Sequence, residues 1–97
     1  MNKKIVPEPI EFDWDKGNVD KSYQKHGIIP NEAEEVFLDE KAIIIRDIKH
    51  SQKEERLILL GETTGRKLLF IVFTIRGTKI RIISARKANE KEREQYE

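Results

Sequence analysis

The sequence predicts an α+β fold with two N-terminal helices, an antiparallel sheet of about four strands and one C-terminal helix. Apolar residues recur at helical spacing before Asp39 and gather in β-branched and aromatic runs after it, separated by polar breaks that contain glycine. A length of 97 residues suits one domain. We therefore expect a single domain over residues 1–97, with residues 1–9 as a loose N-terminal extension.

The first helix is predicted between Asp15 and His26. Asp15 is a suitable N-cap residue, and Val19 and Tyr23 lie four positions apart on one helical face. Gly27 follows the helix and can adopt the left-handed conformation that ends many helices.

The second helix is predicted to begin at Pro30, because the fixed φ of proline suits a first turn. Ala33, Val36 and Phe37 follow at helical spacing. Residues 31–40 include several acids and no basic residue, so we expect this short acidic helix to face away from any phosphate.

Four strands are predicted near residues 42–46, 55–62, 67–75 and 79–85. The breaks at residues 63–66 and 76–78 are short enough for hairpin loops, so the last three strands should form an antiparallel meander. Asn89 and Glu92 have the spacing of a capping box, which predicts a terminal helix through Tyr96.

The composition excludes several kinds of site. The chain has no cysteine, so disulfides and thiolate metal sites are excluded. His26 and His50 lie far apart, and the acids lack the spacing of a magnesium nuclease, so we expect no metal and no other cofactor. No apolar run reaches about 18 residues and no signal peptide is evident, which predicts a cytoplasmic protein without membrane contact.

Positive charge is concentrated near the C-terminus, although the formal net charge is only +1. Between residues 66 and 93 nine basic residues stand against two acidic ones. Such a cationic segment is typical of a surface that binds phosphates. The basic residues are Arg66, Lys67, Arg76, Lys79, Arg81, Arg86, Lys87, Lys91 and Arg93.

Arg81 and Arg86 are candidates for binding a phosphate at the end of the last strand. A guanidinium group can hold two phosphate oxygens and stays charged at every relevant pH. Strict alternation places Arg81 and Arg86 on opposite sheet faces, so both reach one phosphate only if a bulge or the strand end redirects Arg86. The alternative is that each arginine pairs with a nearby surface glutamate.

Cleaving RNA without a metal also needs a base for the 2′-hydroxyl and an acid for the leaving 5′-oxygen. His26 is the candidate acid, because a helix end favours a protonated imidazole and Lys25 adds a fixed charge. Its alternative role is to bond a carbonyl and lock the turn. Glu54 or Glu55 could be the base while Arg56 binds phosphate, and alternation gives Glu54 and Arg56 the same face. Their alternative is a set of ion pairs on a solvated rim.

Four further residues are candidate RNA contacts. Trp14 could stack on an unpaired base, and its alternative is a place in the core. Arg76, Lys79 and Lys87 would attract phosphates without base specificity.

Several short segments, taken in order, carry a resemblance to a known family. They are Phe12-Asp13-Trp14-Asp15, Lys25-His26-Gly27, residues 32–39, His50-Ser51, Glu54-Glu55-Arg56, Gly61, and residues 81–88 with Glu92, Arg93 and Tyr96. In this order they resemble the BrnT-type toxin family of bacterial and archaeal type II toxin–antitoxin systems. The resemblance covers residues 10–97, and the ordered set is more specific than any single segment.

The resemblance implies a RelE-like ribonuclease fold and metal-independent RNA cleavage that stops translation. It also implies a BrnA-type antitoxin with a ribbon-helix-helix domain, with which the toxin would repress its own operon. Operator DNA would be contacted only through that complex. Ser22 departs from the asparagine frequent in relatives and could alter how the first helix supports His26. The family's functional roles fall on Lys25, His26, Glu54 or Glu55, Arg56, Arg81 and Arg86.

A second class of function uses the same basic face differently. A non-catalytic module would bind nucleic acid or a partner protein there, and substitution of His26 or Glu54 would hardly affect it. A third possibility is a degenerate toxin that keeps only antitoxin binding and repression.

Overall fold

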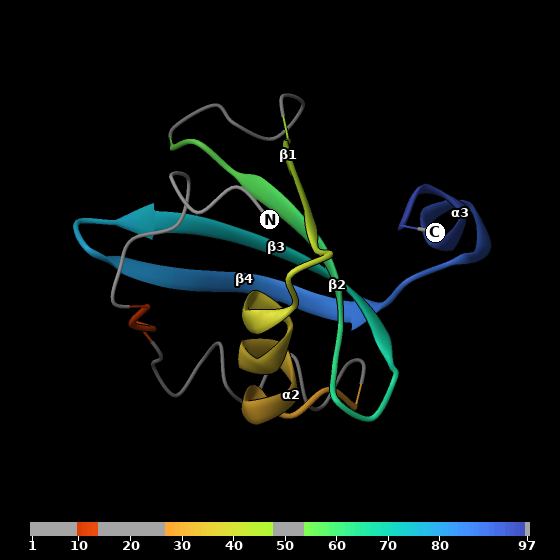
Figure 1. The fold of residues 1–97 in the computed structure, drawn as a ribbon. Helices are drawn as coiled ribbons and strands as arrows, with labels where there is room; N and C mark the ends of the chain where they lie inside the picture. The colour runs from red at the N-terminus through yellow and green to blue at the C-terminus, as the bar shows by residue number, and fades with distance from the viewer. Residues whose placement is uncertain (1–9, 14–26, 48–53, 97) are drawn as a thin grey trace.

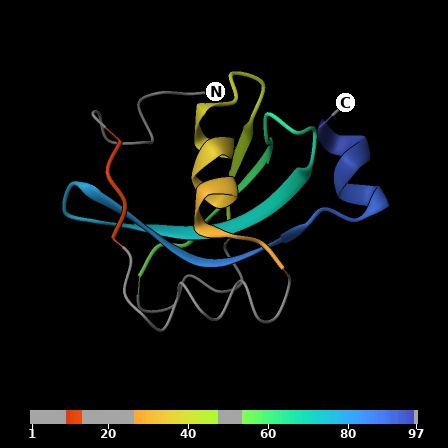
Figure 2. The ribbon, with the colours of Figure 1, turned by 90° about the horizontal axis from the view of Figure 1, so that it is seen from below.

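The computed structural model describes residues 10–13, 27–47 and 54–96. In this part of the chain, a four-stranded sheet carries one helix against one face and a second helix beyond the end of its last strand (Figures 1 and 2). The predicted α+β class and C-terminal helix are confirmed. The predicted first helix and the N-terminal extension lie outside the described residues.

The strands follow one another in the sheet in chain order, and every neighbouring pair is antiparallel. This confirms the predicted meander and extends it to the first strand. Every strand boundary lies within two residues of its predicted position. The strands are β1 (Ile43–Arg46), β2 (Leu57–Glu62), β3 (Leu68–Arg76) and β4 (Lys79–Lys87).

A short N-terminal segment pairs with the free edge of β4. Phe12 forms a parallel bridge with Ile80, and two main-chain hydrogen bonds of 2.8 Å tie Ile80 to the residues on either side of Phe12. The segment brings Asp13 close to Arg81 of β4.

One sheet face, the core face, is covered by α2 (Pro30–Glu35) and the 3-10 turn η1 (Val36–Leu38). The helix begins at its proline, as predicted. Ala33, Val36 and Phe37 are all buried in the core. The ring of Phe37 packs edge-on against an aromatic ring of β3, with centroids 5.0 Å apart.

The close approach of η1 to β2 depends on Gly61. A Cβ atom at Gly61 would lie 3.0 Å from the main-chain oxygen of Val36 and 2.9 Å from Cδ2 of Leu59. Any larger residue would therefore push the helix layer away from the sheet.

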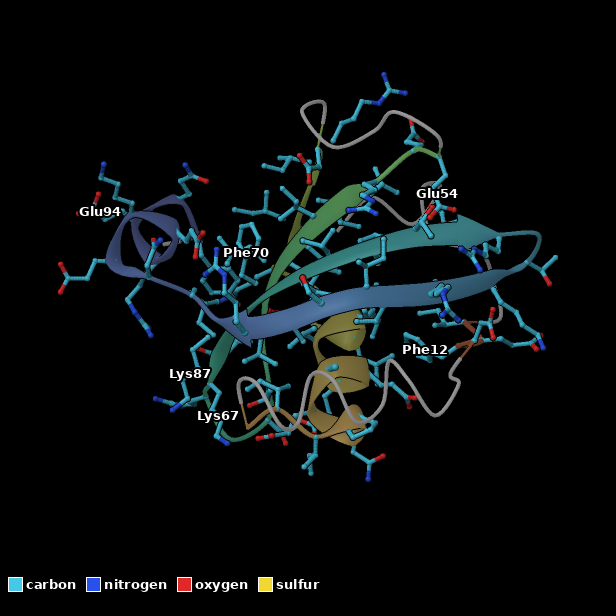
Figure 3. All side chains as sticks on the ribbon, turned by 180° about the vertical axis from the view of Figure 1, so that it is seen from behind. Phe12, Glu54, Lys67, Phe70, Lys87 and Glu94 are labelled. Carbon is cyan, nitrogen blue, oxygen red and sulfur yellow. The ribbon has the colours of Figure 1, made fainter. Side chains whose placement is uncertain are left out.

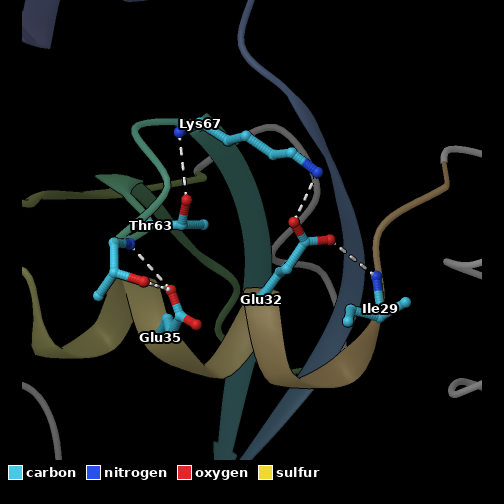
Figure 4. A network of polar contacts seen from close by, with 6 residues as sticks. Ile29, Glu32, Glu35, Thr63 and Lys67 are labelled. Carbon is cyan, nitrogen blue, oxygen red and sulfur yellow. Dashed lines mark hydrogen bonds and ion pairs between the residues drawn. The ribbon is translucent and has the colours of Figure 1, made fainter.

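Polar contacts tie the loop between β2 and β3 to α2 (Figure 4). Lys67 Nζ lies 2.6 Å from Glu32 Oε2, and this hydrogen bond lowers the pKa of Glu32. Thr64 donates from its main-chain N and its hydroxyl to Glu35 Oε1, at 2.9 and 3.0 Å. Glu32 also accepts a hydrogen bond of 3.3 Å from the main-chain N of Ile29.

A β-bulge changes the facing of β4. Ile82 pairs with Phe73 and Ser84 pairs with Val72, which leaves Ile83 as the extra residue. Buried residues of β4 therefore fall on even positions before the bulge and on an odd position after it.

The last helix, α3 (Glu90–Tyr96), begins at the predicted capping box. Asn89 Oδ1 accepts from the main-chain N of Glu92, and Glu92 Oε1 accepts from the main-chain N of Asn89, both at 2.9 Å. At the other end the Tyr96 hydroxyl donates to Asp39 Oδ2 at 2.6 Å. No residue of α3 is buried, so polar contacts hold much of this helix in place.

Candidate functional site

Two arginines frame the candidate site on the outer face, the sheet face opposite α2. Thr74 pairs with Arg81, and both face outward because their neighbours Phe73 and Ile80 are buried in the core. Leu57 begins β2, pairs with Phe73 and faces the core. Arg56 precedes Leu57, so alternation places Arg56 on the outer face beside Thr74. Arg56 and Arg81 thus flank Thr74, with backbones about 10 Å apart across two strand spacings. Two arginine side chains can close that distance around one phosphate.

Arg56, Thr74 and Arg81 form a row across three neighbouring strands, and Thr74 holds this row together. Its side chain is buried, with 2% of the residue exposed, and its hydroxyl donates to the main-chain oxygen of Glu55 at 2.7 Å. The bond fixes the segment before β2 against β3. Thr74 was not among the predicted site residues, although a polar residue within the apolar run of residues 68–75 was a signal.

The two candidate glutamates have different partners. Glu54 Oε2 lies 3.5 Å from Nε of Arg76, which shares the outer face with Thr74 by alternation. Glu55 instead forms an exposed ion pair with Arg46 of β1. Glu54 is therefore the glutamate that lies beside the outer-face cations.

The hairpin between β3 and β4 adds two predicted RNA contacts to this end of the sheet. Arg76 pairs with Lys79 across a two-residue turn in which Gly77 has φ +61°. Alternation gives Lys79 and Arg81 the same face. Figure 3 shows this end of the sheet, where Glu54 is labelled. The structure thus groups Arg56, Arg76, Lys79 and Arg81 with Glu54, and we call these five residues the cationic cluster.

Arg81 has a carboxylate neighbour that the sequence analysis did not select. Its Nη1 lies 3.8 Å from Oδ2 of Asp13, and its side chain is 21% exposed. Asp13 stands in the Phe12-Asp13-Trp14-Asp15 segment, which was the available signal. The ion pair restricts the orientations of the Arg81 guanidinium.

The bulge brings Arg86 to the outer face as well, because Arg86 pairs with Phe70, which faces outward like Thr74. Its Nη1 and Nη2 donate to the two carboxylate oxygens of Glu92, each at 2.8 Å, and its Cζ lies 4.1 Å from the Phe70 ring centroid. These hydrogen bonds raise the pKa of Arg86 and lower that of Glu92. Arg86 pairs with Phe70 and Arg81 pairs with Thr74, which is four residues further along β3. The two arginines therefore lie about 13 Å apart along the strands.

The remaining predicted site residues lie elsewhere. Lys87 pairs with the buried Leu69, so alternation places it on the core face, and Figure 3 shows it near Lys67. Lys25, His26 and Trp14 lie outside the described residues.

No three His, Cys, Asp or Glu side chains gather to hold a metal ion in the described segments. Among the helices described there, none is long and apolar enough to cross a membrane.

Comparison with known proteins identifies the family. The family model described as the ribonuclease toxin BrnT of a type II toxin–antitoxin system matches residues 14–92. The crystal structure of the ribonuclease toxin BrnT from Brucella abortus has the same fold, with a TM-score of 0.63 and 23% identity over 84% of this chain and 99% of that chain. No match was found among curated proteins. The chain therefore belongs to the BrnT family of ribonuclease toxins of type II toxin–antitoxin systems.

Proposed function

We propose that this protein is a metal-independent endoribonuclease toxin that cleaves RNA on the outer face of its sheet and so stops translation. The observation that supports the proposal best is the row in which Arg56 and Arg81 flank Thr74, with Glu54 nearby. Membership of the BrnT family supports RNA as the substrate.

In the proposed reaction Arg56 and Arg81 bind the scissile phosphate and stabilise the negative charge that builds on its oxygens. Glu54 accepts the proton of the 2′-hydroxyl, whose oxygen then attacks phosphorus. The bond from phosphorus to the 5′-oxygen breaks, and His26 donates a proton to that leaving oxygen, with Lys25 beside it. The products are a 2′,3′-cyclic phosphate and a 5′-hydroxyl.

Arg76 and Lys79 are proposed to attract the RNA backbone without reading its sequence. Trp14 is proposed to stack on an unpaired base. Arg86 has no phosphate-binding role in this proposal, because both of its terminal nitrogens donate to Glu92.

The proposed partner is a BrnA-type antitoxin with a ribbon-helix-helix domain, acting in the cytoplasm. The complex would repress its own operon, with the antitoxin contacting operator DNA. The outer-face cations support an acidic or amphipathic antitoxin segment as the neutralising element. Neutralising Arg76, Lys79 and Arg81 together should weaken the complex, and full affinity in that variant would contradict this placement.

The proposed activity is tested by incubating the purified protein with RNA in EDTA. We expect cleavage that leaves 2′,3′-cyclic phosphate and 5′-hydroxyl ends, and a Glu54→Gln variant should lose turnover with little change in RNA affinity. Intact RNA would contradict the proposal. If the wild type and Glu54→Gln bind RNA equally well and neither cuts it, the protein is the non-catalytic module instead.

A further inference from the structure

We propose that Arg86 is not a phosphate ligand and that Arg86 and Phe70 together form a platform on which an RNA base stacks. The inference rests on the proposed function for the identity of the bound polymer. It assigns this end of the outer face to base contact and the cationic cluster to phosphate contact.

The first support is that the guanidinium of Arg86 is already neutralised. Both Nη atoms donate to Glu92, and Nη1 also donates to the main-chain oxygen of Lys87 at 3.1 Å. A guanidinium grips phosphate through the same paired donors. Phosphate binding through this pair of terminal nitrogens would therefore require Arg86 to leave Glu92.

The second support is the aromatic ring beneath Arg86. Cζ lies 4.1 Å from the Phe70 ring centroid, so the guanidinium lies over the ring. The Arg86 side chain is 36% exposed. Unpaired RNA bases stack on aromatic rings and on arginine guanidinium planes. A guanidinium that is backed by a ring and held in plane by a carboxylate offers such a surface at little further entropic cost.

The third support is position. The extra residue Ile83 turns Arg86 to the same face as Arg81, whereas unbroken alternation would turn it toward α2. On β3 and β4, the outward pair of Val72 and Ser84 and the bulge residue Ile83 lie between the pair of Thr74 and Arg81 and the pair of Phe70 and Arg86. A single strand held at one phosphate by Arg81 can therefore run along β4 and place a neighbouring base on Arg86. Figure 3 shows Phe70 beside α3 and Glu54 at the other end of the sheet.

The test is an abasic scan of a short RNA that carries a 2′-O-methyl group at the cleavage site, so that binding is measured without cutting. In the wild-type protein, removal of one particular base should weaken binding roughly 5- to 150-fold, as expected for a stacked base. In Phe70→Leu that loss should shrink to the level of the other positions. This variant keeps Arg86 and Glu92 intact, and circular dichroism reports whether α3 stays folded.

The salt dependence of binding supplies a second readout. Each phosphate contact to single-stranded RNA contributes a slope of about 0.7 in a plot of log affinity against log salt. Arg81→Gln should lower the slope by that amount, and Arg86→Gln should leave it nearly unchanged.

Two outcomes would overturn the platform. An equal drop in slope for Arg86→Gln would make Arg86 a phosphate ligand. An abasic scan that shows no sensitive position, or one that Phe70→Leu does not alter, would show that no base stacks there. Failure of the wild type to cut RNA in EDTA would refute the proposed nuclease and leave these binding results valid.

Discussion

Arg81 and Arg86 stand five positions apart on one strand, and their neighbours give them different chemistry. Nη1 of Arg81 lies 3.8 Å from Oδ2 of Asp13. Arg86 gives both terminal nitrogens to Glu92 at 2.8 Å and rests on Phe70. The same residue type can thus serve phosphate binding in one row of the sheet and base stacking in another.

Substitution of Thr74 should lower both the stability of the protein and its rate of RNA cleavage. Thr74→Val removes the hydroxyl that donates to the Glu55 carbonyl and should lower the free energy of unfolding by about 1 kcal/mol. It also frees the segment that carries Glu54 and Arg56, so RNA cleavage should fall as well. Urea denaturation and cleavage rates measure the two effects. Thr78→Val, exposed in the hairpin turn, is the matched control, and an equal effect there would contradict the role of Thr74.

At the scale of the elements, the helix layer and the sheet meet at Gly61. Gly61→Ala places a Cβ atom 3.0 Å from the Val36 main-chain oxygen, and backbone atoms yield less easily than side chains. Overpacking of this kind costs about 1 to 3 kcal/mol, so the urea midpoint should drop clearly. At Gly65 the nearest atom to an added Cβ is Thr63 Oγ1 at 3.7 Å, so Gly65→Ala should leave the midpoint close to that of the wild type. Similar midpoints for both variants would show that η1 does not pack as described.

Elements coded by neighbouring residues were predictable from the sequence. The capping box of Asn89 and Glu92 needs only residues three positions apart, and the start of α2 needs only its proline. The bulge at Ile83 was not predictable, because it depends on how β4 pairs with β3.

The candidate site was predictable in part. Glu54, Arg56 and Arg81 were selected from the sequence, and the structure places them near one end of one face. Asp13 and Thr74 were missed because each meets its partner across a long stretch of chain. The local sequence marks these two residues as unusual but does not identify their distant partners.

At the scale of the whole molecule, the acids of α2 and the cationic cluster lie on opposite faces of the sheet. The acids of α2 bind Lys67 and Thr64 on the core-face side, whereas the cationic cluster occupies the outer face. A formal net charge of +1 therefore conceals a directed field that would draw a polyanion to one face.

Three carboxylates predict how stability depends on pH. For Asp39 burial alone would raise the pKa, but hydrogen bonds from Tyr96 and two main-chain N–H groups lower it overall. Hydrogen bonds from Lys67 and Arg86 lower the pKa values of Glu32 and Glu92.

A carboxylate with a lowered folded-state pKa stabilises the protein above its ordinary pKa, and that contribution is lost as pH falls through the folded-state value. The ordinary values are 3.8 for Asp39 and 4.5 for the two glutamates. Thermal melts should therefore show a constant stability from neutral pH down to about 5 and a decline below 4.5 that continues past 3.8. Glu92→Gln should make the acid decline shallower. A protein that gained stability on acidification would contradict these contacts.

The most direct test of the central claim compares Arg81→Gln with Arg66→Gln in RNA cleavage with EDTA present. Both variants lose one positive charge, but Arg66 is exposed in the loop between β2 and β3, away from the row of Arg56, Thr74 and Arg81. Arg81→Gln should lower the cleavage rate about a hundredfold or more, by analogy with the loss of one charge-stabilising donor, and Arg66→Gln should stay near the wild-type rate. Equal rates for the two variants would contradict a phosphate site on the outer face.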